Sequence, residues 1–582
     1  MSQLQKLKDA KDRKELALIL GFKPSALTSI VYKTPLEEKY STFEILKKNG
    51  EKREIKAPSP KLKKLQSHLA HLLYACLEEI DKSKNSHPVS YGFRRDGTIM
   101  ANAKNHKRRR YVLNIDIKDF FPSLNFGRVR GYFLKDNAFS LEEQVATTIA
   151  QIACDGKALP QGSPCSPVIS ELIGQVLDLR LLRFAKKHGV RYSRYADDLT
   201  FSTNQKIFPE ALAKQDSSTV SGWVLGEELV AKINGSGFEI NSEKTRMHCR
   251  GSRQSVNGLV VNEKANIRSE YYRRSRAMCD SLFQRGVYFR SMTVPTKPDE
   301  EPKPQLADNL NPLEGILSHI YAVTQSEERR PVPDQRKEPR AIRSLYRRFL
   351  FYKYCIALKS PLIITEGKTD PIYLREAIRF RTSFQPELGK STKKGFEFVP
   401  RFYNYLGQAH EIMDLGGGSG DLKSIPLDYL KNLDLNHKSR KPFAHLPIAH
   451  PVILVLDNDD GLGSVASTIK KNFRVSITKA STDDFYHVTH NLYVVKTPEG
   501  DKDSCIEDLF PKKWRDYKLN GKKFSAASKI DPATEYSKEV FAKSVIKPNA
   551  EHINFSGFDP LLDRLVAVLK HYPKHGPKPF PT

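Results

Sequence analysis

A pair of adjacent carboxylates, Asp197 and Asp198, constrains this sequence more than any other feature. They lie in the stretch RYADDLTFS, where apolar residues precede them and the strand-forming Leu199-Thr200-Phe201 follows. Two unshielded neighbouring acids repel each other and raise each other's pKa. A divalent cation with oxygen ligands relieves that repulsion. The pair therefore predicts a metal site, with a solvated hairpin turn as the alternative.

A third acid lies upstream, at the end of another predicted strand. Val112, Leu113 and Ile115 form a buried strand pattern that delivers Asp116 before the chain turns. Carboxylates from distant parts of a sequence that meet at two metals support in-line phosphoryl displacement. Downstream, GFEINSEKTR places Lys244 just past a short strand, where an ammonium can protonate a leaving pyrophosphate.

The charge of the chain indicates an anionic partner. The 582 residues carry a net charge of +28, and a basic surface attracts polyphosphates over a long range. The segment YGFRRDGTIMANAKNHKRRR, residues 91–110, concentrates Lys and Arg among Gly, Asn and His. It suits the phosphates of a template or an incoming nucleotide, and a solvated loop is the alternative.

Length, cysteines and hydropathy limit the class of protein. A chain this long needs several domains, and its seven cysteines form no Cys-x-x-Cys pair, which argues against a zinc ribbon or a disulfide framework. The N-terminus is too polar for a signal peptide, and no run approaches the roughly 18 apolar residues of a membrane span. We therefore expect a cytoplasmic protein with no membrane partner.

Two further segments give local expectations. Residues 1–80 are expected to be helical, because leucines recur at helical spacing on both sides of Gly21. The stretch LPQGSPCSPVISEL predicts a loop and then a helix that begins at Ser166-Pro167. The backbone amides of that loop and the Gln161 amide suit a nucleotide or its template base.

The motifs together resemble those of a reverse transcriptase of the retron type. NIDIKDFFPSL, LPQGSPCSP, RYADDLTFS and GFEINSEKTR follow the order of that family. NAKNH, from Asn102 to His106, is similar to the Asn-Ala-x-x-His element of retrons. SVNGLVVN, from Ser255 to Asn262, stands in the place of their Val-Thr-Gly element, with Asn257 where the family usually has Thr.

This resemblance implies a right-hand polymerase. Its parts would be N-terminal helices and fingers over 1–110, a ferredoxin-like palm with part of the fingers over 111–262, and a helical thumb with linker helices over 263–357. The implied catalytic residues are Asp116, Asp197 and Asp198, which would bind two Mg²⁺, together with Lys244. The expected nucleotide contacts are Phe121, which would exclude a 2′-hydroxyl, Gln161, Gly162, Arg109, Arg110 and Lys107. The expected RNA contacts are Asn102, His106, Asn257, Gly258, Arg273, Arg274 and Arg276.

The resemblance also implies partners. The substrates would be deoxynucleoside triphosphates and a cognate structured noncoding RNA whose guanosine 2′-hydroxyl primes synthesis. The product would be a branched, RNA-linked single-stranded DNA (msDNA). A homo-oligomer is left open. A group II intron or a diversity-generating reverse transcriptase is the alternative within the enzyme class.

From Pro361 onward, strand and helix patterns alternate. A buried strand precedes Glu366, and a second one, VILVL, precedes Asp457 and Asp459. Because the carboxyl ends of parallel strands share one edge of a sheet, these acids can meet around a metal. The turn DLGGGSGD, residues 414–421, is either a phosphate-binding loop or an ordinary turn.

These acids resemble the motifs of the TOPRIM domain of topoisomerases, primases and overcoming-lysogenization-defect nucleases. The resemblance implies a Rossmann-like α/β domain with a C-terminal helical extension over 358–582. One or two Mg²⁺, or Mn²⁺, would bind Glu366, Asp457 and Asp459, with Glu507 either a further ligand or a surface acid. The segment lacks room for a topoisomerase and the cysteines of a primase, so a nuclease fits best. The whole would be a multidomain α/β protein acting in anti-phage defence, unless the C-terminal part is a non-catalytic binding or assembly module.

Overall fold

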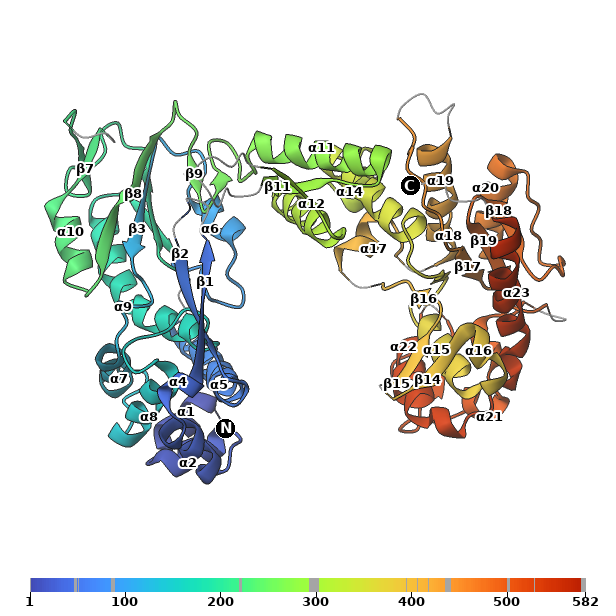
Figure 1. Ribbon diagram of the computed structural model, residues 1–582, viewed down its shortest axis with the longest axis horizontal. Helices are drawn as coiled ribbons and strands as arrows, with labels where there is room; N and C mark the ends of the chain where they lie inside the picture. Colours follow the sequence, from blue (N-terminus) through green and yellow to red (C-terminus); the bar gives the residue numbers. More distant parts are fainter. Residues whose placement is uncertain are drawn as a thin grey trace. The chain divides into compact units, whose positions relative to one another are not determined.

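The computed structural model describes residues 2–46, 50, 52–84, 89–218, 222–292, 303–393, 395–405, 407–416, 418–434, 441–499, 503–527 and 529–576. The chain divides into two compact units (Figure 1). The first unit comprises residues 1–269 with 323–328, and the second comprises 270–322 with 329–582.

The first unit begins with helices that flank a strand hairpin in the sequence. Its helices here are α1 (Gln3–Asp9), α2 (Arg13–Ile19), α3 (Pro24–Thr28), α4 (Leu36–Lys39) and α5 (Pro60–Lys84). The antiparallel strands β1 (Tyr40–Leu46) and β2 (Lys52–Pro58) lie between α4 and α5. This hairpin corrects the expectation that residues 1–80 are helical throughout.

The centre of the first unit is a four-stranded antiparallel sheet in the order β4-β5-β3-β8. Its strands are β3 (Tyr111–Lys118), β4 (Arg191–Tyr195), β5 (Asp198–Thr203) and β8 (Glu239–Cys249). The main apolar core contains Leu113 and Ile115 of β3 and Leu199 and Phe201 of β5. The helices that join these strands are α7 (Phe126–Lys135), α8 (Glu143–Ala153), α9 (Ser166–Lys187) and α10 (Glu227–Asn234).

The opposite face of this sheet is polar. Successive side chains of a strand point to opposite faces, so Asn114 and Asp116 of β3 alternate with the core residues, as Asp198 and Ser202 of β5 do. Helix α6 (Ile99–Asn105) packs against β4 and against the hairpin of β9 (Ser255–Val256) and β10 (Leu259–Val260). Helix, hairpin and Val112 of β3 share a second, small apolar cluster.

The second unit contains a five-stranded sheet in the order β16-β13-β17-β19-β18. Its strands are β13 (Leu362–Thr365), β16 (Arg401–Phe402), β17 (Val452–Leu456), β18 (Tyr486–Thr489) and β19 (Leu492–Lys496). All neighbours are parallel except β18, which pairs with β19 in the antiparallel sense. Every residue of β13, β17 and β19 is buried, as is usual for parallel strands covered on both faces.

Helices complete the second unit. They include α11 (Ser269–Arg285), α12 (Asn311–Gln325), α13 (Val332–Lys337), α14 (Ala341–Phe351), α15 (Asp370–Phe380), α18 (Ser419–Leu422), α19 (Ser424–Leu433), α20 (Leu462–Phe473), α22 (Lys538–Val540) and α23 (Asp559–His575). Among the described helices, no single one is long and apolar enough to cross a membrane, and only a pair bent by 108°, Arg13–Ile19 with Pro24–Lys33, reaches that length and composition together.

Candidate metal-binding active sites

The three aspartates of the first unit lie at one end of its sheet. Asp116 on β3 and Asp198 on β5 are direct cross-strand partners. Asp197 lies in the two-residue turn between Tyr195 and Asp198, which pair across β4 and β5. Ala196, the other turn residue, has a φ of 55°. The tight turn therefore holds Asp197 beside the pair on the strands.

These carboxylates perturb one another electrostatically. Burial raises the pKa of Asp198 to about 6, and the neighbouring Asp197 and Asp116 carboxylates add to this shift. Burial also raises the pKa of Asp197, with a contribution from Asp116. The three carboxylates carry an excess of negative charge and offer only oxygen atoms as ligands. This donor set fits a hard divalent cation such as Mg²⁺.

Lys244 supplies a positive charge at this site. Its Nζ lies 3.0 and 3.1 Å from the two carboxylate oxygens of Asp116. Burial acts to lower the pKa of Lys244, but the bond to Asp116 and the charges of the aspartates raise it overall. Lys244 lies within β8 and not past the end of a strand, because β8 runs to Cys249 and bulges opposite Asn114 and Asp116. The lysine is therefore protonated and directed at the aspartates.

Three predicted nucleotide contacts lie in loops close to β2 or β3. Phe121 follows β3, and its ring packs between Phe93 and Phe120 at centroid distances of 5.7 and 5.6 Å. The Gln161 carbonyl accepts a hydrogen bond of 2.8 Å from the backbone of Lys56 on β2. Gly162 has a φ of +122°, and a Cβ atom there would lie 2.6 Å from the Lys56 carbonyl oxygen. Glycine is therefore required where this loop meets the hairpin β1–β2.

The other predicted triphosphate contacts, Lys107, Arg109 and Arg110, are not near the aspartates, and that prediction was wrong. Six residues of extended chain separate Arg110 from Asp116, or about 20 Å. The backbone of Arg110 donates to Thr203 at the far end of β5, and Lys107 pairs with Glu327 at 3.2 Å. The backbone of these residues therefore lies at the end of β3 away from Asp116.

A basic residue that the sequence did not single out lies nearer. Arg53 on β2 lowers the pKa of Asp197 through its charge, against the larger effect of burial. The alternating pattern KREIK and the dipeptide Asn49-Gly50, which favours tight hairpin turns, were the available signals. Both signals were overlooked because residues 1–80 were expected to be helical.

The residues predicted to bind RNA divide into three groups. Asn102 and His106 are completely buried, so direct contact with RNA is wrong for both. Arg273, Arg274 and Arg276 are exposed on α11 in the second unit. The turn residues Asn257 and Gly258 join β9 to β10, and the Asn257 amide donates to Asp198 at 3.0 Å. Asn257 therefore belongs to the acidic site itself.

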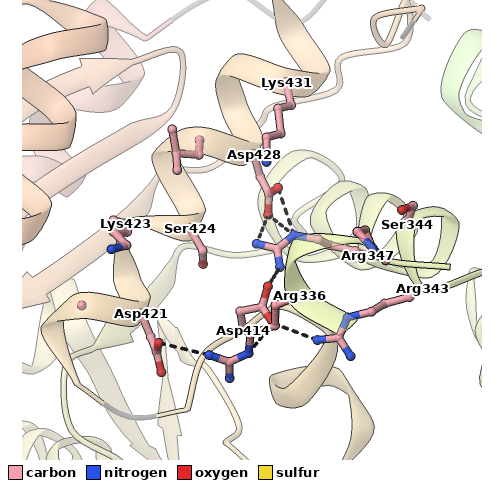
Figure 2. A pocket seen from close by; sticks show the side chains of 13 residues that line it. Arg336, Arg343, Ser344, Arg347, Asp414, Asp421, Lys423, Ser424, Asp428 and Lys431 are labelled. Atoms are coloured by element: carbon pink, nitrogen blue, oxygen red, sulfur yellow. Dashed lines mark hydrogen bonds and ion pairs between the residues drawn. The ribbon is translucent and has the colours of Figure 1, made fainter. Parts of the chain in front are cut away.

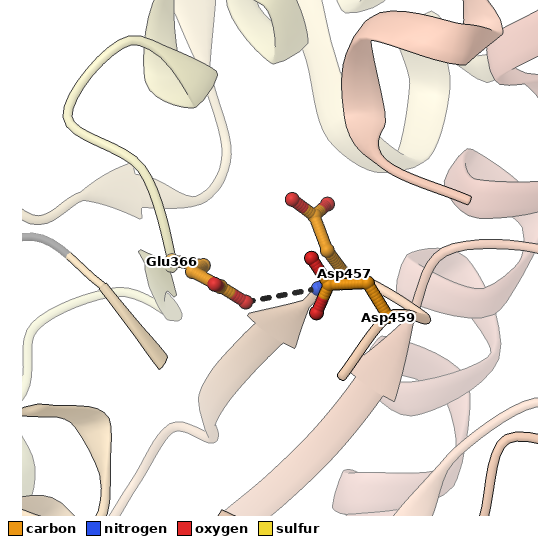
Figure 3. A group of neighbouring side chains, drawn as sticks. All are labelled: Glu366, Asp457 and Asp459. Atoms are coloured by element: carbon orange, nitrogen blue, oxygen red, sulfur yellow. Dashed lines mark hydrogen bonds between the residues drawn. The ribbon is translucent and has the colours of Figure 1, made fainter. Parts of the chain in front are cut away.

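The second acidic site lies at the carboxyl ends of two parallel strands. Glu366 follows β13 and Asp457 follows β17, and these strands pair so that Thr365 lies opposite Val455. Within the described part of the chain, Glu366, Asp457 and Asp459 are the one set of three acidic, histidine or cysteine residues with ligand atoms all within 4.8 Å of one another (Figure 3). The predicted convergence of these carboxylates is thus present. The ligand atoms of Asp116, Asp197 and Asp198 in the first unit are not all within that distance.

Further acids surround this triad. Burial raises the pKa of Asp457 to about 9, and Asp370, Glu366 and Glu507 add to the shift. Burial, chiefly, with Glu507 raises the pKa of Asp370 to about 7. Glu507 is buried and not on the surface, and it accepts a hydrogen bond of 3.0 Å from Lys538. Oxygen ligands with this excess of negative charge fit Mg²⁺ or Mn²⁺.

The glycine-rich turn at 414–421 is tied to a cluster of arginines. Asp414 accepts hydrogen bonds from Arg343 and Arg347 and pairs with Arg336, as Figure 2 shows. Arg347 also reaches Asp428 at 2.9 Å, and a cavity of about 290 Å³ lies among these side chains. Asp414, the first aspartate of the turn, is thus engaged in ion pairs. The backbone N–H of Gly418 donates a hydrogen bond of 3.2 Å to the Glu366 carbonyl. This hydrogen bond links the turn to the backbone of Glu366.

Comparison with known proteins finds similarity over part of the chain. A family profile described as reverse transcriptase (RNA-dependent DNA polymerase) matches residues 45–267. The retron Ec86 reverse transcriptase of Escherichia coli is 34% identical over 248 residues, which cover 42% of this chain and 70% of that protein. The retron Mx65 reverse transcriptase of Myxococcus xanthus is 33% identical over 284 residues, and the chain spans 61% of its length. The apo telomerase of Candida tropicalis shares 16% identity over 42% of this chain and 61% of its own, with a TM-score of 0.27, too low to carry an argument.

Proposed function

Because this chain belongs to the retron reverse transcriptase family, we propose that its first unit is an RNA-directed DNA polymerase that uses deoxynucleoside triphosphates. The observation that carries the proposal is the pairing of Asp116 with Asp198 across β3 and β5, with Asp197 in the adjoining turn. When bound there, two Mg²⁺ would activate the primer hydroxyl and stabilise the charge that develops on the transferred phosphate.

The chain's own residues would divide the remaining work. Phe121, held between two other phenylalanine rings, would lie under the sugar and exclude a 2′-hydroxyl. Gln161 and Gly162 would line the nucleotide pocket, with the charge of Arg53 nearby. Lys244 carries the proton that the leaving pyrophosphate requires.

We further propose that the template is a cognate structured noncoding RNA and that the product is branched msDNA. Family membership and the net charge of +28 support an RNA partner. The exposed arginines Arg273, Arg274 and Arg276 on α11 would contact the RNA backbone as part of a proposed thumb at 263–357.

The test is the nucleic acid that copurifies with the protein from cells carrying its native flanking DNA. The wild type should carry a discrete DNA that shifts on RNase treatment, and Asp197→Asn should carry none. Asp9→Asn, the same change at an exposed position of α1, should behave as the wild type. Primer extension on RNA without any copurifying DNA would retain the polymerase and exclude the branched product.

We propose that residues 358–582 form a TOPRIM nuclease, the effector of an anti-phage system. The convergence of Glu366, Asp457 and Asp459 supports this proposal. The second candidate function is a binding or assembly module, for which the dense arginine and aspartate pairs of the same unit are compatible evidence.

Full-length variants distinguish the two functions. Asp457→Asn should abolish metal-dependent cleavage of RNA, tRNA or DNA and also phage resistance, while msDNA is still made. Asp460→Asn alters an exposed neighbour outside the triad and should preserve both. Resistance that survives Asp457→Asn, with no cleavage by the wild type, would favour the binding module.

A further inference from the structure

A chain of hydrogen bonds crosses the polar face of the first unit's sheet and ends on Asp198. It connects six side chains from α6, β4, β5 and the β9–β10 turn, in the order Ser202, His106, Ser193, Asn102, Asn257 and Asp198. The chain therefore joins both ends of β5 through residues that are far apart in the sequence.

Each link is within hydrogen-bond distance. His106 Nδ1 lies 2.7 Å from Ser202 Oγ, and its Nε2 lies 2.6 Å from Ser193 Oγ. The Ser193 hydroxyl bonds Asn102 Oδ1. Asn102 Nδ2 lies 2.5 Å from Asn257 Oδ1. Asn257 Nδ2 lies 3.0 Å from Asp198 Oδ2.

The carboxylate at the end of the chain fixes every orientation in it. An ionised Asp198 only accepts, so Asn257 turns its NH₂ toward Asp198 and its oxygen toward Asn102. Asn102 must then donate to Asn257, which leaves its own oxygen for the Ser193 hydroxyl. Ser193 therefore accepts from His106 Nε2–H, and Nδ1 accepts from Ser202. Each hydrogen bond in this chain then has one donor and one acceptor. All the bonds run in the same direction, and such hydrogen-bonded chains polarise one another.

Because its side chains are buried, this chain of hydrogen bonds is costly to break. Ser202, His106 and Asn102 have no exposed surface, and Ser193 is 1% exposed. Burial lowers the pKa of His106 to about 3, and the charges of Arg109 and Arg191 add to the shift. The imidazole is therefore neutral near pH 7 and can both donate and accept, as the chain requires.

The backbone of the turn directs Asn257 at Asp198. Asn257 has a φ of 47° and Gly258 a φ of 81°, and Val256 pairs with Leu259 on either side. Two central residues with positive φ define the hairpin turn that favours Asn-Gly. The β9 strand is in turn held on β3, because Asn114 Nδ2 donates to the Ser255 carbonyl at 2.8 Å.

We propose that Asn257 is a positioning residue that holds the Asp198 carboxylate in its metal-binding orientation, and that Asn102 and His106 act through it. This inference rests on the proposed polymerase function of Asp198. The Asn257 amide donates to Oδ2 of Asp198 and thereby fixes the orientation of the carboxylate. Oδ1 then keeps its direction although the Asp116 and Asp197 carboxylates repel Asp198. The residues that match the Asn-Ala-x-x-His element thus serve the acidic site and not RNA contact.

The test measures metal binding separately from catalysis. The full-length protein carries Asp457→Asn, which disables the second acidic site. It is titrated with Mn²⁺ in the absence of nucleic acid, and free Mn²⁺ is followed by electron paramagnetic resonance. Asn257→Gly retains the positive φ and removes the amide. It should weaken Mn²⁺ binding about tenfold or more, the effect of one hydrogen bond to a charged group. Primer extension should show the same shift in its Mg²⁺ dependence, with kcat reduced and the KM for template-primer unchanged.

Two further variants complete the design. Asn102→Ala leaves the turn intact and removes the partner of Asn257 Oδ1, so it should weaken Mn²⁺ binding in the same direction. It also provides the test should Asn257→Gly fail to fold. Asn520→Gly is the matched control, because Asn520 and Gly521 form an exposed turn with φ values of 51° and 80° in the second unit. It should leave Mn²⁺ binding unchanged.

The outcomes separate the inference from the function on which it rests. A wild type that extends no primer would refute the polymerase. A wild type that extends primers, with Mn²⁺ affinity unchanged in both Asn257→Gly and Asn102→Ala, would refute the positioning role alone. A higher KM for template-primer with unchanged Mn²⁺ affinity would also refute it, because Asn257 would then contact the nucleic acid.

Discussion

Acidification should destabilise the first unit through one buried histidine. Burial, with Arg109 and Arg191, lowers the pKa of His106 to about 3, whereas an unfolded histidine titrates near 6.5. Between these values the unfolded chain binds one more proton than the folded chain. The stabilisation is therefore complete above pH 6.5 and is lost as the pH falls toward 3. At 1.36 kcal/mol per pH unit, the whole window corresponds to about 5 kcal/mol, and the part between pH 6.5 and 4.5 to about 2 kcal/mol.

The two tryptophans of the chain allow this effect to be assigned to the first unit. Trp223 lies in the first unit and Trp514 in the second, so urea unfolding in a Trp514→Phe background reports on the first unit alone. His106→Gln retains a donor and an acceptor but does not titrate. It should remove about 2 kcal/mol of the pH dependence between pH 6.5 and 4.5, whereas His71→Gln, at an exposed position of α5, should not. Equal pH slopes for the wild type and His106→Gln would refute the reasoning.

Three other substitutions test separate features. Gly162→Ala should strain the loop by about 1–3 kcal/mol and raise the KM for nucleotides, because its Cβ would lie 2.6 Å from the Lys56 carbonyl; Gly131→Ala, in open space on α7, should not. Asp414→Asn should lower the unfolding free energy of the second unit by about 3 kcal/mol in urea, because three arginines lose their shared carboxylate; Asp460→Asn should have little effect. Phe121→Ala should admit ribonucleotides in primer extension, and unchanged sugar discrimination would contradict its assignment.

The sequence predicted the elements whose signals are local. The apolar residues before Asp116 and the strand-forming residues after Asp198 predicted strands at both positions, and the buried run before Asp457 predicted a parallel strand ending at an acid. The roles of these acids stay predictions. In each case the run of strand-forming residues beside the acid, and not a distant contact, specifies where the acid lies.

The errors arose where spatial proximity was inferred from sequence proximity. Arg109 and Arg110 precede Asp116 by a few residues, but an extended strand carries them to the opposite end of the sheet. Asn257 follows Asp198 by 59 residues, and yet their side chains meet. The hairpin β1–β2 was missed because the leucine periodicity on either side of it is the stronger signal, and Arg53 was missed with it.

The two acidic sites differ in how they compensate mutual repulsion. In the first site, Lys244 bonds Asp116 and the Asn257 amide bonds Asp198. Burial raises the pKa of Asp198 only to about 6, because the Asn257 hydrogen bond and the charge of Lys244 act to lower it. In the second site, the ligand atoms lie within 4.8 Å, and burial with three nearby acids raises the pKa of Asp457 to about 9. Without a cation, Asp457 therefore retains a proton at neutral pH that Asp198 has already lost. Cation binding at the second site must displace that proton, so the affinity of the second site for a cation continues to rise with pH after that of the first has levelled off.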